Sequence, residues 1–167
     1  MVIVECYAEE ELVKALGFSR VEHEENKAAV IKELEREAGA GAKLVGMVDE
    51  DPGSTWPKSW RSFRLIRVSR HGFSVWAGPG EIIYAIVLQP RHEEWAYRAA
   101  RACGLDPRDY GLPKDPEDFW ELLHRGRRLR LRTLARYRKM LTDMLHRRCP
   151  ALLELRKELR ALLKDGA

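Results

Sequence analysis

Short apolar runs alternate with amphipathic segments along the first fifty residues. Residues 2–4 and 44–48 are continuous apolar runs, which is typical of strands that are buried on both faces. Residues 8–16 and 24–38 place apolar side chains at helical spacing, and each of these segments ends at a glycine. The order strand, helix, helix, strand with unalternating strands predicts a parallel sheet that is covered by helices.

Three further apolar runs extend the predicted sheet. Residues 63–69, 73–76 and 81–88 are rich in β-branched and aromatic side chains and are bounded by turn residues, so each predicts a strand. Residues 56–62 predict a loop, and residues 93–102 predict a helix. The predicted fold is therefore α/β, with a mostly parallel, Rossmann-like sheet flanked by helices.

The last third of the chain has a different pattern. Residues 106–116 contain three prolines and predict a connector, and from residue 117 the chain predicts helix to its end, interrupted at Cys149-Pro150. We therefore divide the chain into an α/β domain, residues 1–105, and a connector with a basic amphipathic helical tail, residues 106–167. The tail places apolar residues on one recurring face, which predicts helices packed on the domain. These are Leu129, Leu134, Tyr137, Leu141, Met144, Leu145, Leu152, Leu155, Leu159 and Leu162.

The net charge of +4 hides an uneven distribution. Residues 125–148 contain ten Lys or Arg and one Asp, a net +9, so the rest of the chain is −5. A basic segment on an acidic body favours a polyanion, such as nucleic acid, or an acidic protein as its partner. The alternative is an ordinary solvated helix face. The candidate nucleic-acid-binding residues are Arg127, Arg128, Arg130, Arg132, Arg136, Arg138 and Lys139.

Several classes of protein are disfavoured by composition and motifs. No apolar run approaches the roughly 20 residues of a membrane span, and the N-terminal residues do not resemble a signal peptide. Cys6, Cys103 and Cys149 are odd in number and far apart, which favours a reducing cytoplasm over a disulfide framework or a zinc ribbon. The sequence has no HExxH, GxGxxG or GxxxxGK[ST] motif. Abundant charge with few Asn and Gln is a feature of thermophilic proteins.

Acidic residues follow two of the predicted parallel strands. Asp49 and Asp51 end the run at residues 44–48, just before Pro52-Gly53, and Glu5 follows the run at residues 2–4. Carboxylates two residues apart on an extended backbone point to the same side, and neighbouring parallel strands bring their carboxyl ends together. Three such carboxylates would suit Mg²⁺ or Mn²⁺. The alternative for Asp49 and Asp51 is a turn in which Asp caps backbone amides.

These acidic positions resemble the motifs of the Toprim domain, the catalytic fold of topoisomerases, bacterial primases and overcoming-lysogenization-defect nucleases. The family's Glu-Gly-x-x-Asp matches Glu5-Cys6-Tyr7-Ala8-Glu9, and its Asp-x-Asp matches Asp49-Glu50-Asp51. The resemblance covers about residues 1–100 and departs from the family where Cys6 replaces Gly and Glu9 replaces Asp. It implies that Glu5 and Glu9 are catalytic, with Glu5 as general acid or base, and that Asp49, Asp51 and Glu5 hold the metal.

The resemblance and the basic tail together predict a metal-dependent nuclease that acts on nucleic acid. The alternative is a non-enzymatic subunit that docks an ATPase or another protein through its helical tail, and a nucleotide or RNA binder is a third hypothesis. A homo-oligomer is a further possible assembly under any of these hypotheses. Glu93 or Glu94 could add a metal ligand or simply favour a helix N-terminus. Lys27, Arg70 and His71 are further candidates for phosphate contact, with an ordinary surface role as the alternative for each.

Overall fold

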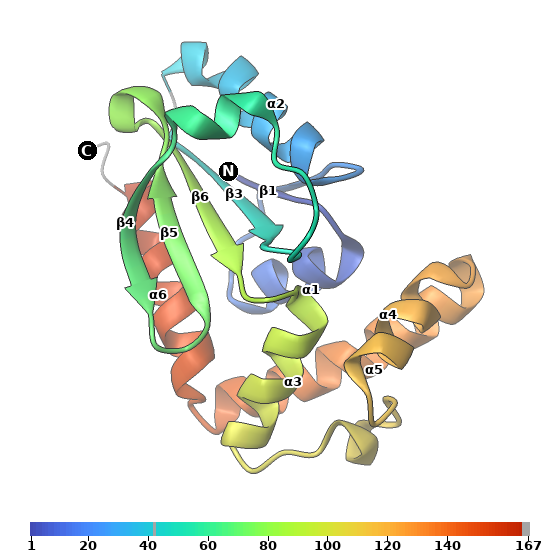
Figure 1. The fold of residues 1–167 in the computed structure, drawn as a ribbon. Coiled ribbons are helices and arrows are strands. Elements are labelled where there is room, and N and C mark those ends of the chain that lie inside the picture. Colours follow the sequence, from blue (N-terminus) through green and yellow to red (C-terminus); the bar gives the residue numbers. More distant parts are fainter. Residues whose placement is uncertain (42, 165–167) are drawn as a thin grey trace.

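A computed structural model describes residues 1–41 and 43–164 of the chain, and its centre is a six-stranded sheet (Figure 1). The strands are β1 (Val2–Val4), β2 (Val21–His23), β3 (Leu44–Asp49), β4 (Arg64–Ser69), β5 (Phe73–Ala77) and β6 (Ile83–Leu88). Their order is β2-β1-β3-β6-β5-β4. Strands β2, β1, β3 and β6 are parallel to one another. Strand β5 pairs antiparallel with β6, and β4 pairs antiparallel with β5. This confirms the predicted α/β class with a mostly parallel sheet.

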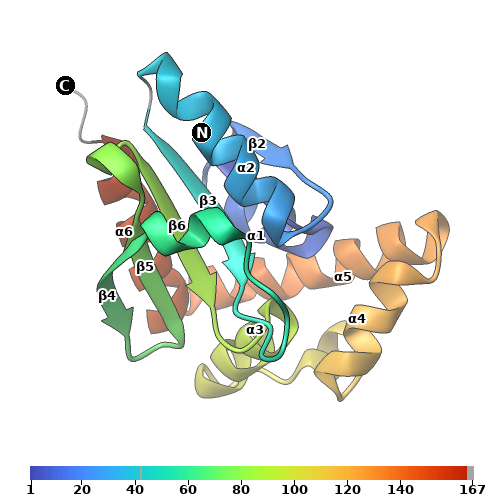
Figure 2. The ribbon, with the colours of Figure 1, turned by 45° about the horizontal axis from the view of Figure 1, so that its top comes forward.

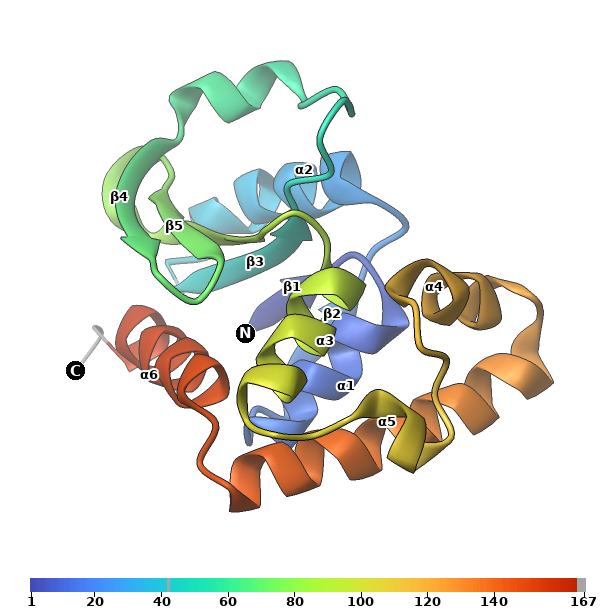
Figure 3. The ribbon, with the colours of Figure 1, turned by 60° about the horizontal axis from the view of Figure 1, so that its bottom comes forward.

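Helices cover both faces of the sheet. They are α1 (Tyr7–Ala15), α2 (Lys27–Glu37), α3 (His92–Ala102), α4 (Pro116–His124), α5 (Arg127–His146) and α6 (Pro150–Lys164). Short 3₁₀ turns occupy η1 (Ala38–Ala40), η2 (Lys58–Ser62), η3 (Pro79–Glu81) and η4 (Pro107–Tyr110). Helix α2 lies on one face, whereas α1, α3, α5 and α6 lie on the other (Figures 2 and 3).

The strand side chains alternate between two apolar clusters, one on each face. In β3, Val45 and Met47 join the larger cluster, while Leu44 and Val48 join the smaller cluster under α2. The larger cluster also contains most of the predicted apolar face of the tail, including Tyr137, and Leu145 is partly buried against it. Leu129, in the first turn of α5, lies outside the cluster. The tail is therefore part of the packed body.

Two local features differ from the sequence prediction. Strand β2 was not predicted, because it has only three residues and its side chains are partly or fully exposed. The helical tail is also divided once more than expected, between α4 and α5, where Gly126 adopts a φ of 122°. A glycine takes this backbone conformation without the steric cost that a side chain would add.

The prediction that the cysteines are not joined in disulfides was wrong for one pair. Cys103 and Cys149 form a disulfide with a Cα–Cα distance of 5.6 Å, and Cys6 is the free cysteine. The two bonded residues are 46 positions apart, and α4 and α5 lie between them. Sequence spacing gave no sign of the pairing, because only the folded path brings the end of α3 to the start of α6.

Across residues 1–41 and 43–164, none of the helices combines the length and the apolar character that crossing a membrane requires.

Gly46 allows α2 to lie close against β3. A Cβ at this position would stand 2.8 Å from Leu34 Cδ1 and 2.9 Å from Val30 Cγ1, closer than side chains normally pack. The backbone of β3 therefore serves directly as part of the surface that α2 covers. The smaller apolar cluster depends on this close approach.

We expect Gly46→Ala to lower the free energy of unfolding by about 1–3 kcal/mol, because the added methyl overpacks the contact with α2. Urea denaturation followed by circular dichroism measures this change. Gly39→Ala is the matched control, since a Cβ there meets nothing within 4 Å. Equal stability of the two variants would contradict the close packing of α2 on β3.

Candidate functional site

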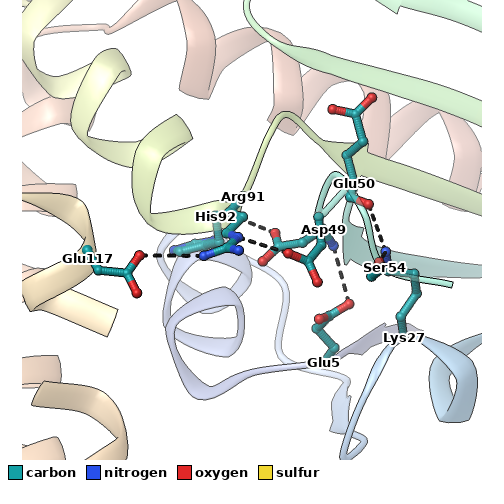
Figure 4. Close-up of polar contacts among 9 residues, drawn as sticks. Glu5, Lys27, Asp49, Glu50, Ser54, Arg91, His92 and Glu117 are labelled. Carbon is teal, nitrogen blue, oxygen red and sulfur yellow. Dashed lines mark hydrogen bonds and ion pairs between the residues drawn. The ribbon is translucent and has the colours of Figure 1, made fainter. Parts of the chain in front are cut away.

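Two of the predicted acidic residues, Glu5 and Asp49, meet at the carboxyl edge of the sheet. Strands β1 and β3 are adjacent and parallel, with Val4 opposite Met47, so Glu5 and Asp49 both lie at the same edge. The carboxylate of Glu5 accepts a hydrogen bond of 3.2 Å from the backbone N–H of Asp49 (Figure 4). The prediction that adjacent parallel strands bring these two residues together is confirmed.

The N-terminus of α3 closes this edge from the side of β6. Asp49 Oδ1 accepts a 2.7 Å hydrogen bond from the backbone N–H of His92, the first residue of α3 (Figure 4). A helix N-terminus favours a nearby negative charge through its free N–H groups and its dipole. The contact fixes the direction of the Asp49 side chain.

Asp51 does not follow the extended geometry that the sequence predicts. Strand β3 ends at Asp49, and Asp51 has a φ of +49°, so the argument from an extended backbone fails there. Its Oδ1 accepts a 2.9 Å hydrogen bond from Arg91 Nε, and Arg91 also pairs with Glu117 of α4 at 3.5 Å. The carboxylate of Asp51 is therefore paired with Arg91 and is not directed to one side together with Asp49 as predicted.

Glu9 has a structural role at the start of α1. Its Oε2 accepts hydrogen bonds from the backbone N–H groups of Glu5, at 2.8 Å, and Cys6, at 3.2 Å. In return, Cys6 Sγ accepts from the Glu9 N–H at 3.4 Å, which completes a capping box. Glu9 Oε1 is buried and has no hydrogen-bond partner among the described residues. The carboxyl of Glu9 thus fixes the backbone from which Glu5 projects.

Burial and mutual repulsion disfavour negative charge in this cluster. Burial, opposed in part by Lys27, raises the pKa of Glu5 to about 7. Burial and the neighbouring Glu5 and Glu93 raise the pKa of Asp49 to about 9, and burial raises the pKa of Glu93 to about 7. The pKa of Glu9 is raised well above its usual value by burial and by Asp49. Four carboxyl groups therefore compete for charge at one edge of the sheet.

Lys27 is the cation that the fold brings to this cluster from α2. Its ammonium group donates 2.8 Å hydrogen bonds to the Glu50 carbonyl and to Ser54 Oγ, and it lies 4.0 Å from the ring centre of Trp56. Burial lowers its pKa, and the carboxylates of Glu5 and Asp51 act in the opposite direction. Of the three predicted phosphate contacts, Lys27 is the one that lies beside Glu5.

The other two predicted contacts lie elsewhere. His71 pairs with Glu154 of α6 at 3.5 Å, and Arg70 is exposed in the turn between β4 and β5. At the start of α3, Glu93 is buried and Glu94 is exposed, so the structure separates the two glutamates that the sequence left as alternatives.

Sequence reasoning missed His92. Its ring is fully buried, its Nε2 lies 2.8 Å from the hydroxyl of Tyr137, and its Nδ1 has no partner among the described residues. Burial lowers its pKa to about 3, so the ring is neutral at physiological pH. The contact joins the N-terminus of α3 to α5, which no local sequence pattern indicates.

Within residues 1–41 and 43–164, no three His, Cys, Asp or Glu side chains are grouped as ligands for one metal ion. Glu5 and Asp49 bring two carboxyl groups to one place, whereas Asp51 is held by Arg91. Magnesium sites often use one or two carboxylates, with water and substrate phosphates as the remaining ligands. The donors at this edge fit a site of that kind better than a closed cage.

The seven predicted basic residues have different environments. Arg138 forms two 2.7 Å hydrogen bonds to Glu11, and Arg136 donates to the Gly111 carbonyl at 2.9 Å, so both attach α5 to the body. Arg130 lies 4.2 Å from the ring centre of Tyr7. The remaining four are exposed and form no ion pair within the described part of the chain: Arg127, Arg128, Arg132 and Lys139.

No family model matches this chain, and no curated protein or solved structure matches it either.

We expect the metal-free protein to lose stability as the pH rises from 6.5 to 9. Acids whose pKa is raised by folding stabilise the fold most below their unfolded pKa, near 4, and lose this contribution as pH passes the folded values of about 7 and about 9. His92 has a pKa of about 3 in the fold and near 6.5 in the unfolded chain, so it contributes a small gain of stability with pH that ends about one pH unit above 6.5. The expected fall is about 1 kcal/mol per pH unit for each proton released.

Urea denaturation in EDTA at several pH values measures this slope. Asp49→Asn removes the group with the higher pKa and should flatten the slope, mostly at its alkaline end. Glu94→Gln is the control, because Glu94 is exposed at the same helix terminus. A profile that is flat from pH 6.5 to 9 in the unaltered protein would contradict the crowding of carboxyl groups.

Proposed function

We propose that this protein is a Mg²⁺- or Mn²⁺-dependent nuclease with a Toprim-like site at the carboxyl edge of its sheet. The observation that supports this most directly is the meeting of Glu5 and Asp49, within a cluster of buried carboxyl groups, beside Lys27. Holding such groups together is costly unless they are protonated or neutralised by a cation. Ionisable groups whose pKa is shifted by burial and by neighbouring charges are concentrated at functional sites.

In this proposal the chain's residues have separate tasks. Asp49, fixed by the His92 N–H, and Glu5 are the residues that would hold the cation. When bound, the cation neutralises charge on the phosphate and lowers the pKa of a bound water. As the resemblance implies, Glu5 would also act as the general acid or base that exchanges a proton with the attacking or leaving oxygen. Lys27 contacts the phosphate from the side of α2.

The alternative, a non-enzymatic subunit docked through its helical tail, has less support. The apolar face of the tail is buried against the sheet and its helices, so it is already used within the chain. Trp120 and Leu131, 40% and 56% exposed, are the large apolar side chains that α4 and α5 leave on the surface. The apolar surface of these two side chains is small compared with the area that a stable protein–protein interface buries.

The test is cleavage of labelled DNA and RNA with Mg²⁺ or Mn²⁺. Glu5→Gln and Asp49→Asn keep the shape of each side chain and remove its charge, so each should lower the rate by at least about 100-fold. Both variants should also lose the thermal stabilisation that Mn²⁺ gives the unaltered protein.

Glu94→Gln removes an exposed carboxylate from the same region and should cleave at the normal rate. Circular dichroism confirms that each variant is folded. Cleavage by Asp49→Asn at the unaltered rate would exclude the proposed role of this edge.

A further inference from the structure

Three side chains from separate elements form a stack beside Glu5. The rings of Tyr7 and His23 are 4.4 Å apart with an angle of 15° between their planes. The guanidinium of Arg130 lies over the same tyrosine ring, 4.2 Å from its centre. Both groups therefore contact the Tyr7 ring, which links His23 to Arg130.

The stack stands at the same edge of the sheet as the carboxyl cluster. His23 is the last residue of β2 and lies opposite Val4 of β1, immediately before Glu5. Tyr7 follows Glu5 by two residues and begins α1, which packs against α5, the helix that carries Arg130 (Figure 3). The stack therefore joins the proposed active site to the basic helix.

The outer end of the stack is open to solvent. Tyr7 is 41% exposed, and His23 is also exposed, so the face of its ring that is turned from Tyr7 is accessible. The next residues are Glu24 and Glu25. Their carboxylates repel a phosphate at this end, while a nucleobase brings an uncharged π face to the imidazole. The His23 end thus favours a base over a backbone phosphate.

The helix that carries Arg130 also carries free arginines at its start. Arg127, Arg128 and Arg132, together with Arg125, line an open hollow of about 540 Å³ where α5 begins. The first three form no ion pair with any residue in the described ranges 1–41 and 43–164. The first turn of α5 also has no acidic residue. This end favours the phosphates of an extended backbone.

We propose that the substrate is a single-stranded nucleic acid that binds across these two regions. One base stacks on His23, and phosphates of the same strand contact Arg127, Arg128 and Arg132 where α5 begins. In a duplex the base faces are covered by neighbouring base pairs, so only a single strand offers a free face to His23. The assignment rests on the proposed nuclease function and names its substrate class.

Binding in EDTA tests this substrate class without requiring catalysis. Fluorescence anisotropy with a short labelled oligothymidylate, and with a duplex of the same length, gives the two affinities. The single strand should bind more tightly than the duplex. His23→Ala and Tyr7→Ala should weaken single-strand binding about ten-fold, whereas Tyr7→Phe, which keeps the ring, should bind normally.

The salt dependence separates stacking from phosphate binding. For Arg128→Ala and Arg132→Ala, the slope of log affinity against log salt should fall by about 0.7 for each phosphate that the variant no longer neutralises. His23→Ala should leave this slope unchanged. Arg160→Ala is the charge-matched control, since Arg160 is exposed on α6, away from the stack.

The outcomes distinguish this inference from the nuclease proposal. Stack-dependent single-strand binding without cleavage would retain the binding site and reject the nuclease. Cleavage with equal affinity for duplex and single strand, or with no effect of His23→Ala, would overturn the single-strand assignment alone. Failure to bind either nucleic acid in EDTA would reject the single-strand site, while the cleavage assay with Mg²⁺ or Mn²⁺ tests the nuclease separately.

Discussion

The structure depends on keeping several carboxyl groups together at one edge of the sheet. Glu5 follows β1, Glu9 lies in α1, Asp49 ends β3 and Glu93 lies in α3. Each has a pKa raised mainly by burial. Backbone N–H groups offset part of this cost at three of these side chains: Asp49 donates to Glu5, Glu5 and Cys6 donate to Glu9, and His92 donates to Asp49. The same hydrogen bonds fix β1, α1, β3 and α3 relative to one another.

The sequence predicted the parts of this arrangement that follow from local patterns. The buried strands, the class of the sheet and the meeting of Glu5 with Asp49 come from unalternating apolar runs that end in acidic residues. The position of the Asp51 side chain was not predictable, because it depends on the positive φ of Asp51 and on its ion pair with Arg91, which is 40 residues later. The capping role of Glu9 was hard to recognise, because the N-cap is Cys6 and not the Ser, Thr, Asp or Asn that signals a capping box in a sequence.

Tertiary contacts decide the roles of the basic residues, which all look alike in the sequence. Arg136 and Arg138 attach α5 to the body, Arg130 stacks on Tyr7, and Arg127, Arg128 and Arg132 remain exposed. The charge count identified the basic segment but could not tell which of its residues pack on the body and which stay exposed. The residues that make this difference, such as Glu11 and Tyr7, are more than a hundred positions away in the sequence.

The buried contact between His92 and Tyr137 bears on how the molecule can be subdivided. It places a residue of α5 directly beneath the helix terminus that holds Asp49, and Phe119 and Leu155 belong to the same apolar cluster as the strands. A fragment ending at residue 105 would lack this support and would expose the apolar side of α1 and α3 to water. The α/β part and the helical tail therefore share one apolar cluster and are not separated by a solvent-exposed boundary.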